Sequence, residues 1–302
     1  MISYCNFHTA YCDCTRHRIA IWRNLEKFTK IAIVSILPSF VIISSRLSFI
    51  LQEFTAFVWK QGYACIFWGF LLLCFIVTKF FYPIDFLYRY DALLLLAIGF
   101  QIALLVLKLE QWKEVLVIGI FHMVALCMEI FKTLPSIASW SYPEPFVMGI
   151  LGVPLFAGFM YSAVGSYLAR VWRIFDFRFV NYPKISWSVI LAVGIYANFF
   201  THHFIADLRY FLVLWVLLLF GRTRIYFTPR KTSYSMNLVV WFGLVALFIW
   251  FAENIATAMN VWIYPNQSIT WTLVSPQKIL AWFLLVILSF VLVSLIHKPK
   301  DL

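Results

Sequence analysis

The stretch ILAWFLLVILSFVLVSLIH, residues 279–297, is an almost unbroken run of apolar side chains. A helix that crosses a bilayer needs about 20 mostly apolar residues, so this segment is expected to span a membrane. The whole chain has the same character, because 63% of its 302 residues are hydrophobic and only 12% are charged. One aqueous core could not bury so much apolar surface, since soluble domains are about half apolar and a quarter charged. The sequence therefore predicts a membrane protein.

Eight segments are expected to cross the bilayer, of which the sixth is short and either tilted or merged with its neighbour. They are 64–82, 91–108, 115–132, 147–169, 186–206, 209–221, 237–257 and 279–297. The predicted fold class is all-α, a polytopic transmembrane helix bundle with about eight spans.

A further segment, 31–51, is interrupted by Pro38 and Arg46. It either lies in the membrane interface as a peripheral helix or forms a ninth crossing. We therefore divide the chain into 1–53, a basic cytoplasmic tail with this segment, and 54–302, the integral membrane domain.

The net charge of +11 is interpreted as positive cytoplasmic loops that contact anionic headgroups, and no nucleic-acid partner is expected. The basic residues are Arg170, Arg173, Arg178 and Lys184 in one loop, Arg222, Arg224, Arg230 and Lys231 in another, and Lys298 and Lys300 at the C-terminus. Two crossings separate each group from the next, so all three can be cytoplasmic. We expect a multi-pass protein of the inner cell membrane with a cytoplasmic C-terminus.

Two helix hairpins, 115–169 and 237–297, look like degenerate copies of one unit in the same orientation. Each has a glutamate near the outer end of a helix, followed by Trp-x-Tyr-Pro. The first copy carries Glu129, Trp140 and Tyr142, and the second carries Glu253, Trp262 and Tyr264. Parallel repeats in membrane proteins often frame a site between them.

Ionisable groups inside a membrane cost about 2.5–3.5 kcal/mol each on insertion scales, which makes them candidates for function. The end of segment 186–206 contains Asn198 with His202, and His203 with Asp207, each pair four residues apart and thus on one helix face. Glu129 and Glu253 are expected at the same depth, and His122 lies two turns deeper than Glu129.

Three interpretations of this cluster remain open. In the first, Glu129 and Glu253 are a catalytic acid and base with His202 and His203 as proton relays, while the loop aromatics, Asn198, Asp207 and Asn254 bind the ligand. In the second, a metal ion is held by His122, His202 and His203 with carboxylates as further ligands. In the third, both glutamates bond to Tyr or Trp of their own loops and hold the hairpin shape.

Two other segments have structural explanations. Small residues in 149–170 are expected to let helices approach closely, with Pro154 kinking the helix. Arg89 is expected to pair with a neighbouring aspartate, Asp85 or Asp91, and to anchor a cytoplasmic loop.

The motifs SWSYPEPF, GVPLFAGFMYSAVGSYLAR, NFFTHHF, WFAENIAT and YPNQ together resemble an uncharacterised family of bacterial integral-membrane proteins, the YoaT-like family DUF817. The resemblance covers about residues 54–297 and implies a bacterial cell-membrane protein of unestablished activity. The helix-end glutamate and the aromatic-Tyr-Pro loop are also similar to features of membrane carotenoid cyclases. No residue of that family is carried over, and the likeness implies only a lipophilic substrate.

Three functions follow as expectations. The first is a membrane-embedded enzyme that acts on an isoprenoid or lipid through an outward-facing Glu/His site. The second is a proton-coupled transporter or a small-molecule binding or sensory protein, and the third is a structural membrane protein. The expected partners are the lipid bilayer and a lipophilic small molecule.

Overall fold

A computed structural model of the chain describes residues 46–300. The chain divides into two compact units, Met1–Thr55 and Ala56–Leu302. In the first unit the described residues, 46–55, are helical. Most of the predicted segment 31–51 and of the basic tail lies outside the described residues.

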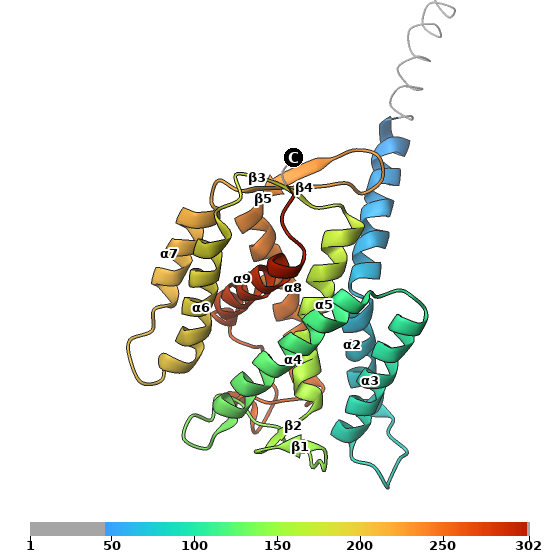
Figure 1. The fold of residues 1–302 in the computed structure, drawn as a ribbon. Helices are drawn as coiled ribbons and strands as arrows, with labels where there is room; N and C mark the ends of the chain where they lie inside the picture. Colours follow the sequence, from blue (N-terminus) through green and yellow to red (C-terminus); the bar gives the residue numbers. More distant parts are fainter. Residues whose placement is uncertain (1–45, 301–302) are drawn as a thin grey trace, which may run out of the picture. The chain divides into compact units, whose positions relative to one another are not determined.

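The second unit is built mainly of helices (Figure 1). They are α2 (Ile66–Phe80), α3 (Arg89–Val106), α4 (Trp112–Thr133), α5 (Phe156–Ile174), α6 (Ile185–Thr201), α7 (Arg209–Phe220), α8 (Leu238–Ala258) and α9 (Lys278–Ile296), with a short 3-10 helix η1 (Pro265–Gln267). The predicted mostly helical fold is confirmed, and each of the eight predicted segments overlaps one of these helices.

Among the described residues, four helices are long and apolar enough to cross a membrane: α3, α4, α8 and α9. A fifth span is added if Arg46–Ala64 and α2, which meet at a bend of 66°, form one crossing. Helices α6 and α7 are apolar but shorter. Four to five candidate spans are thus shown rather than eight.

Large apolar side chains remain exposed on the helix surfaces, as expected for contact with lipid. Leu218 of α7 is 77% exposed and Phe248 of α8 is 71% exposed. Soluble monomers rarely expose extended apolar surface, because water disfavours it. This surface and the apolar helices indicate a membrane protein.

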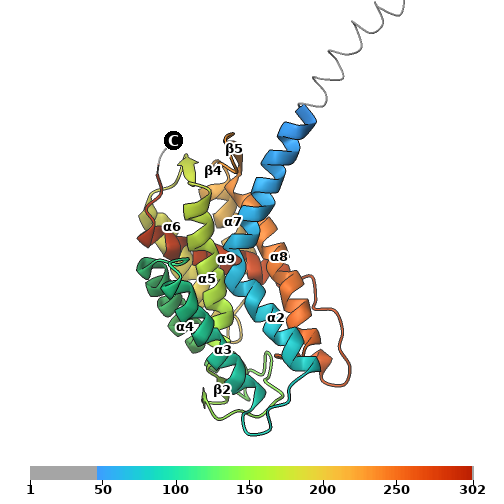
Figure 2. The same ribbon diagram turned by 90° about the vertical axis from the view of Figure 1, so that its right-hand side faces the viewer.

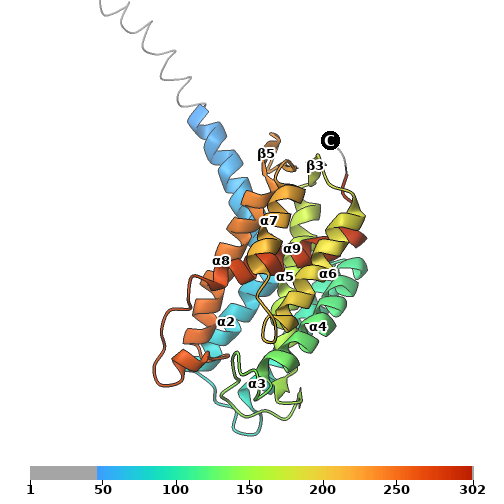
Figure 3. The same ribbon diagram turned by 90° about the vertical axis from the view of Figure 1, so that its left-hand side faces the viewer.

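Helix α9 is the centre of the helical unit. It packs against α4, α5, α6, α7 and α8, and it lies between α6 and α8 in Figure 3. It is the most apolar of the candidate spans, and residues 284–291 are buried. A helix that is apolar on every face is the one expected in the middle of a bundle.

Helix α5 begins later than the sequence predicts. The predicted span 147–169 starts with an antiparallel hairpin of β1 (Gly149–Ile150) and β2 (Val153–Pro154). Gly152, in the turn between the two strands, has a φ of 81°, a left-handed conformation that glycine adopts freely and that is incompatible with an α-helix. Pro154 therefore lies in β2 and does not kink the helix, so that expectation is wrong.

The small residues of α5 do pack against α4, as expected. A Cβ added at Gly158 would lie 2.4 Å from Nδ1 of His122, and one at Gly165 would lie 2.9 Å from the Phe121 ring. The missing side chains let the two helices approach closely.

The basic segments gather at one end of the helical unit. There β3 (Arg178–Val180), β4 (Arg224–Phe227) and β5 (Tyr234–Asn237) form an antiparallel sheet in the order β3-β4-β5. The Phe179 amide donates to the Lys300 carbonyl over 2.9 Å, so the C-terminus joins the same end (Figure 2).

Two residues assigned to the first basic loop belong instead to helix α5. Arg170 is fully buried and forms an ion pair of 2.9 Å with Glu110, which is also fully buried. Arg173 pairs with Glu114 over 2.8 Å. These glutamates compensate the arginine charges, which allows both side chains to lie among apolar helices. In the predicted loop, water would have solvated the arginines.

The predicted ion-pair partner of Arg89, Asp85 or Asp91, is also wrong. Nη1 of Arg89 donates to Glu144 over 2.6 Å, whereas Asp91 accepts from the amides of Val147 and Met148. Arg89 also donates to the carbonyl of Met259, in the loop after α8. These contacts place Arg89 at the end opposite the basic sheet, not beside the basic loops.

Candidate functional site

The two Trp-x-Tyr-Pro loops meet at the end opposite the basic sheet. The amide of Ser141 donates to Ile263 and the amide of Ile263 donates to Ser141, both over 3.0 Å. The rings of Trp140 and Tyr264 also contact edge to face, with centroids 6.3 Å apart. The middle residues of both motifs thus form one antiparallel bridge.

Glu129, near the C-terminal end of α4, is 1% exposed. Its carboxylate accepts hydrogen bonds from Nε1 of Trp140 over 2.8 Å and from the Tyr142 hydroxyl over 2.6 Å. The hydroxyl of Tyr161, in α5, also hydrogen-bonds to it. Burial and the Glu129 charge raise the pKa of Tyr142, which keeps this donor protonated.

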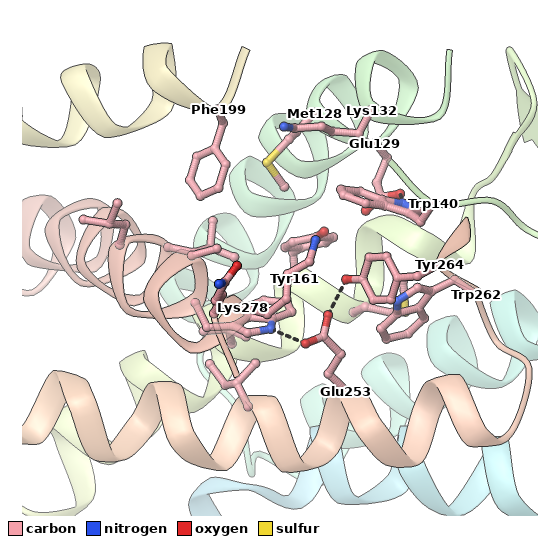
Figure 4. Close-up of a pocket in the computed structure, with 18 of the residues that line it drawn as sticks. Met128, Glu129, Lys132, Trp140, Tyr161, Phe199, Glu253, Trp262, Tyr264 and Lys278 are labelled. Atoms are coloured by element: carbon pink, nitrogen blue, oxygen red, sulfur yellow. Dashed lines mark hydrogen bonds between the residues drawn. The ribbon is translucent and has the colours of Figure 1, made fainter. Parts of the chain in front are cut away.

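Glu253, near the C-terminal end of α8, is held in the same way (Figure 4). Oε1 accepts from the Tyr264 hydroxyl over 2.5 Å, and Oε2 accepts from Nε1 of Trp282 over 2.7 Å. Trp262 hydrogen-bonds to Tyr264 instead, so α9 supplies the indole that the loop supplies to Glu129. Each glutamate is therefore bonded to aromatic donors, at least one from its own loop.

Both carboxylates line one cavity of about 230 Å³. Figure 4 shows Glu129 and Glu253 approaching it from different helices. The walls are largely aromatic and include Trp68, Trp140, Tyr142, Tyr161, Phe199, Trp262, Tyr264 and Trp282. Of the residues predicted from the sequence, Asn198 and His202 also line it. An apolar cavity with a few convergent polar groups is the usual form of a small-molecule site.

The remaining predicted residues lie outside the wall of this cavity. Because α6 ends at Thr201, His203 and Asp207 do not share a helix face as predicted. Asp207 is exposed and pairs with Nε of Arg209 over 2.5 Å, and its Oδ1 accepts from the Arg209 amide over 2.9 Å and from Nδ2 of Asn198 over 3.2 Å. The side chain of Asn198 accepts from the Leu208 amide over 3.0 Å, and the turn that it holds follows the end of α6 at Thr201.

Asn254 and His122 have structural contacts. Asn254 accepts from the Val274 amide over 2.9 Å and donates to the Trp250 carbonyl over 2.8 Å, which ties the loop after α8 to the helix. The ring of His122 packs against Gly158 and, at 4.8 Å between centroids, against Phe159.

The histidines are arranged around a lysine. Nζ of Lys132 lies 3.3 Å from Nε2 of His202 and 2.8 Å from Nε2 of His203. Nδ1 of His202 lies 2.7 Å from the Asn198 carbonyl and donates to it, which leaves Nε2 as an acceptor for the ammonium. Desolvation and the Lys132 ammonium lower the pKa of His203 to about 4, so both rings accept as neutral groups near pH 7.

The residues described by the structure contain no group of three or more His, Cys, Asp or Glu that could hold a metal ion. The set His122, His202 and His203 is not brought together, since His122 faces α5. The geometry thus adds no support to the metal interpretation.

The cavity wall also contains residues that were not predicted from the sequence, among them Lys132, Tyr161, Lys278 and Trp282. Lys132 had a detectable signal, because it follows Glu129 by three residues and so lies on the same helix face. No sequence signal distinguished Tyr161 and Trp282, since each is one aromatic residue among many in an apolar segment.

Comparison with known proteins gives a family and no activity. A family model described as "Protein of unknown function (DUF817)" matches residues 53–290. The chain is 40% identical over 251 residues to "Uncharacterized protein YoaT" of Bacillus subtilis (strain 168), an alignment covering 83% of this chain and 94% of the relative. No solved structure matches the chain.

Proposed function

The chain belongs to the DUF817 family of unknown function, and we propose that it is a membrane protein that binds a small lipophilic molecule between its helices. The observation that carries this proposal is the cavity in which Glu129 and Glu253, from different helices, face one largely aromatic space. Aromatic walls favour an apolar ligand, and the few polar groups orient it.

We further propose that the two carboxyl groups exchange protons with the ligand, which makes the chain a membrane-embedded enzyme. A carboxyl group can act as acid or base when it is within hydrogen-bonding reach of the reacting atom. The hydroxyl groups of Tyr142, Tyr161 and Tyr264 touch these carboxyls and can orient them.

A structural role is the rival function, and one observation favours it. Each carboxylate accepts a hydrogen bond from Trp and at least one from Tyr, a pattern that would also hold two loops in place. Buried polar groups need such partners whether or not they do chemistry.

The proposed orientation has the basic sheet in the cytoplasm and the cavity at the outer side of the cell membrane. Its support is the gathering of basic segments at one end, which the positive-inside rule assigns to the cytoplasm. In this arrangement α2 to α9 are eight crossings, with the shorter α6 and α7 supported by their neighbours, and the two hairpins are one repeated unit.

Mass spectrometry of membrane extracts tests the enzymatic function. One host expresses the natural chain, a second the Glu129→Gln, Glu253→Gln double variant, and a third the control Asp85→Asn, whose side chain is exposed. We expect a lipid or isoprenoid product with the natural chain and the control only. Identical extracts with a monodisperse double variant would contradict the acid–base role, and a double variant that does not stay monodisperse in detergent would support the structural one.

A further inference from the structure

Lys132 is a buried cation with neutral partners. It is 4% exposed, and its ammonium is hydrogen-bonded to the rings of His202 and His203. Among the described residues no carboxylate lies within ion-pair distance of it, and Asp207, which attracts it from farther away, is paired with Arg209. A buried charge is normally paired, because removal from water is costly.

Lys278, the first residue of α9, is a second cation in the same cavity wall. Its ammonium lies 4.3 Å from the ring centre of Tyr264 and 5.8 Å from that of Trp140. Glu253 attracts it, but the oxygens of Glu253 are already bonded to Tyr264 and Trp282. The cation–π contacts hold Lys278 beside the cavity without neutralising its charge.

Arg209 also lines the cavity, but its charge is paired with Asp207, so among the described lining residues Lys132 and Lys278 are the cations without an ion pair. Lys278 and Arg209 both repel Lys132, and Arg209 also repels Lys278. Like charges in a low-dielectric space raise the free energy of the empty site. Glu129 and Glu253 line the same cavity, but their oxygens are bonded to Trp and Tyr donors. An anion bound between the two ammonium groups would offset their repulsion and replace the water they have lost.

We propose that the molecule bound in the cavity carries an anionic head, a carboxylate or a phosphate, held by Lys132 and Lys278. This inference rests on the proposed binding function and names the class of its ligand. The cavity, at about 230 Å³, is smaller than a typical pocket for a drug-sized ligand of about 300–1,000 Å³. It therefore holds the head and the first carbons, and the rest of the chain lies along the apolar helices.

The first test compares head groups at constant chain length. The full chain in detergent is titrated with a brominated fatty acid, the matching alcohol, the matching amine and the matching alkyl phosphate. Bromine quenches tryptophan, and four tryptophans line the cavity: Trp68, Trp140, Trp262 and Trp282. Specific quenching is the part reversed by an excess of the unbrominated acid. We expect the acid and the phosphate to bind with a Kd about tenfold lower than that of the alcohol, with the amine weakest.

Sodium acetate and inorganic phosphate form the second arm, as competitors without an apolar chain. We expect them to displace the brominated acid only at far higher concentration. Displacement at the same concentration as the fatty acid would mean that the site takes a free anion, and the amphiphilic ligand would be overturned.

Lys278→Met and Lys132→Met remove each charge while keeping an apolar chain, and Lys184→Met, at the basic end, is the matched control. We expect each cavity variant to raise the Kd of the acid about tenfold and to leave that of the alcohol unchanged. An unchanged ratio of acid to alcohol affinity would overturn the anionic head. The head-group series on the natural chain remains decisive if a variant does not fold.

The same titrations separate the two proposals. Equal, saturable binding of acid and alcohol would retain the binding function and reject the anionic head. No reversible quenching by any of the four probes would reject the binding function itself.

Discussion

The backbones of Ser141 and Ile263 are hydrogen-bonded to each other in both directions, each bond measuring 3.0 Å. This one bridge joins the loop after α4 to the loop after α8. The same loops supply Trp140 and Tyr142 to Glu129, and Tyr264 to Glu253. The relative position of the two carboxyls therefore depends on a contact between residues that carry no charge.

Ile263→Pro removes the amide that donates to Ser141, while Ile263→Val keeps it. We expect the proline variant to lose about 1–3 kcal/mol of unfolding free energy, because the Ser141 carbonyl loses its partner. Thermal unfolding in detergent, followed by tryptophan fluorescence, measures the change. Equal unfolding midpoints for the two variants would show that the bridge does not stabilise the loops.

Gly158→Ala places a methyl group against the ring of His122, 2.4 Å from Nδ1. We expect a loss of about 1–3 kcal/mol from overpacking, which the added substitution His122→Ala relieves in part. Gly99→Ala is the matched control, since a Cβ there meets nothing within 4 Å and alanine is the better helix former. Purified yield and unfolding temperature measure both effects, and a neutral Gly158→Ala would contradict the close approach of α4 and α5.

Arg170→Met leaves the fully buried Glu110 without its ion-pair partner. Removing one member of such a pair costs about 3–5 kcal/mol, since the remaining charge is uncompensated. The double variant Arg170→Met, Glu110→Leu is expected to recover much of this loss. Size-exclusion profiles and unfolding temperatures of the two variants test the pair, and a single variant as stable as the natural chain would contradict it.

Acidification is expected to weaken the fold around His203. Desolvation and the Lys132 ammonium lower its pKa from 6.5 to about 4. Between these values the unfolded chain binds a proton that the folded chain excludes, so stability is full above about pH 6.5 and falls towards pH 4. Unfolding midpoints at about pH 7.5 and about pH 5 measure the fall, and His203→Gln is expected to reduce it. A variant with the same pH dependence as the natural chain would assign the effect to another group.

Helix positions could be predicted from the sequence because they depend on local properties. Segment 237–257 was predicted and α8 is Leu238–Ala258, an apolar run whose start is capped by the side chain of Asn237 bonding to the Val239 amide. Segment 279–297 and α9, Lys278–Ile296, agree equally well. The sequence also placed Glu129 and Glu253 near the ends of their helices, since these distances can be counted along the chain, and both line one cavity.

The predicted helix ends were wrong where backbone conformation or hydrogen bonding ends a helix inside an apolar segment. The hairpin that contains Gly152 and Pro154 makes α5 begin later than predicted, and the turn at 202–208 ends α6 before His203. The same early helix ends make α6 and α7 apolar yet shorter than a full span, so apolarity along the sequence does not determine the number of crossings.

By itself, then, the sequence determined a helical membrane protein, the order and rough limits of its helices, and the position of two glutamates near helix ends. Only the tertiary structure decided the partners: Glu144 for Arg89, Trp282 for Glu253, and two histidines for Lys132. Helix formation depends on residues a few positions apart, so a local pattern reveals it. The two members of each of these pairs are 29 to 71 positions apart along the chain. Only the packing of helices and loops brings them together.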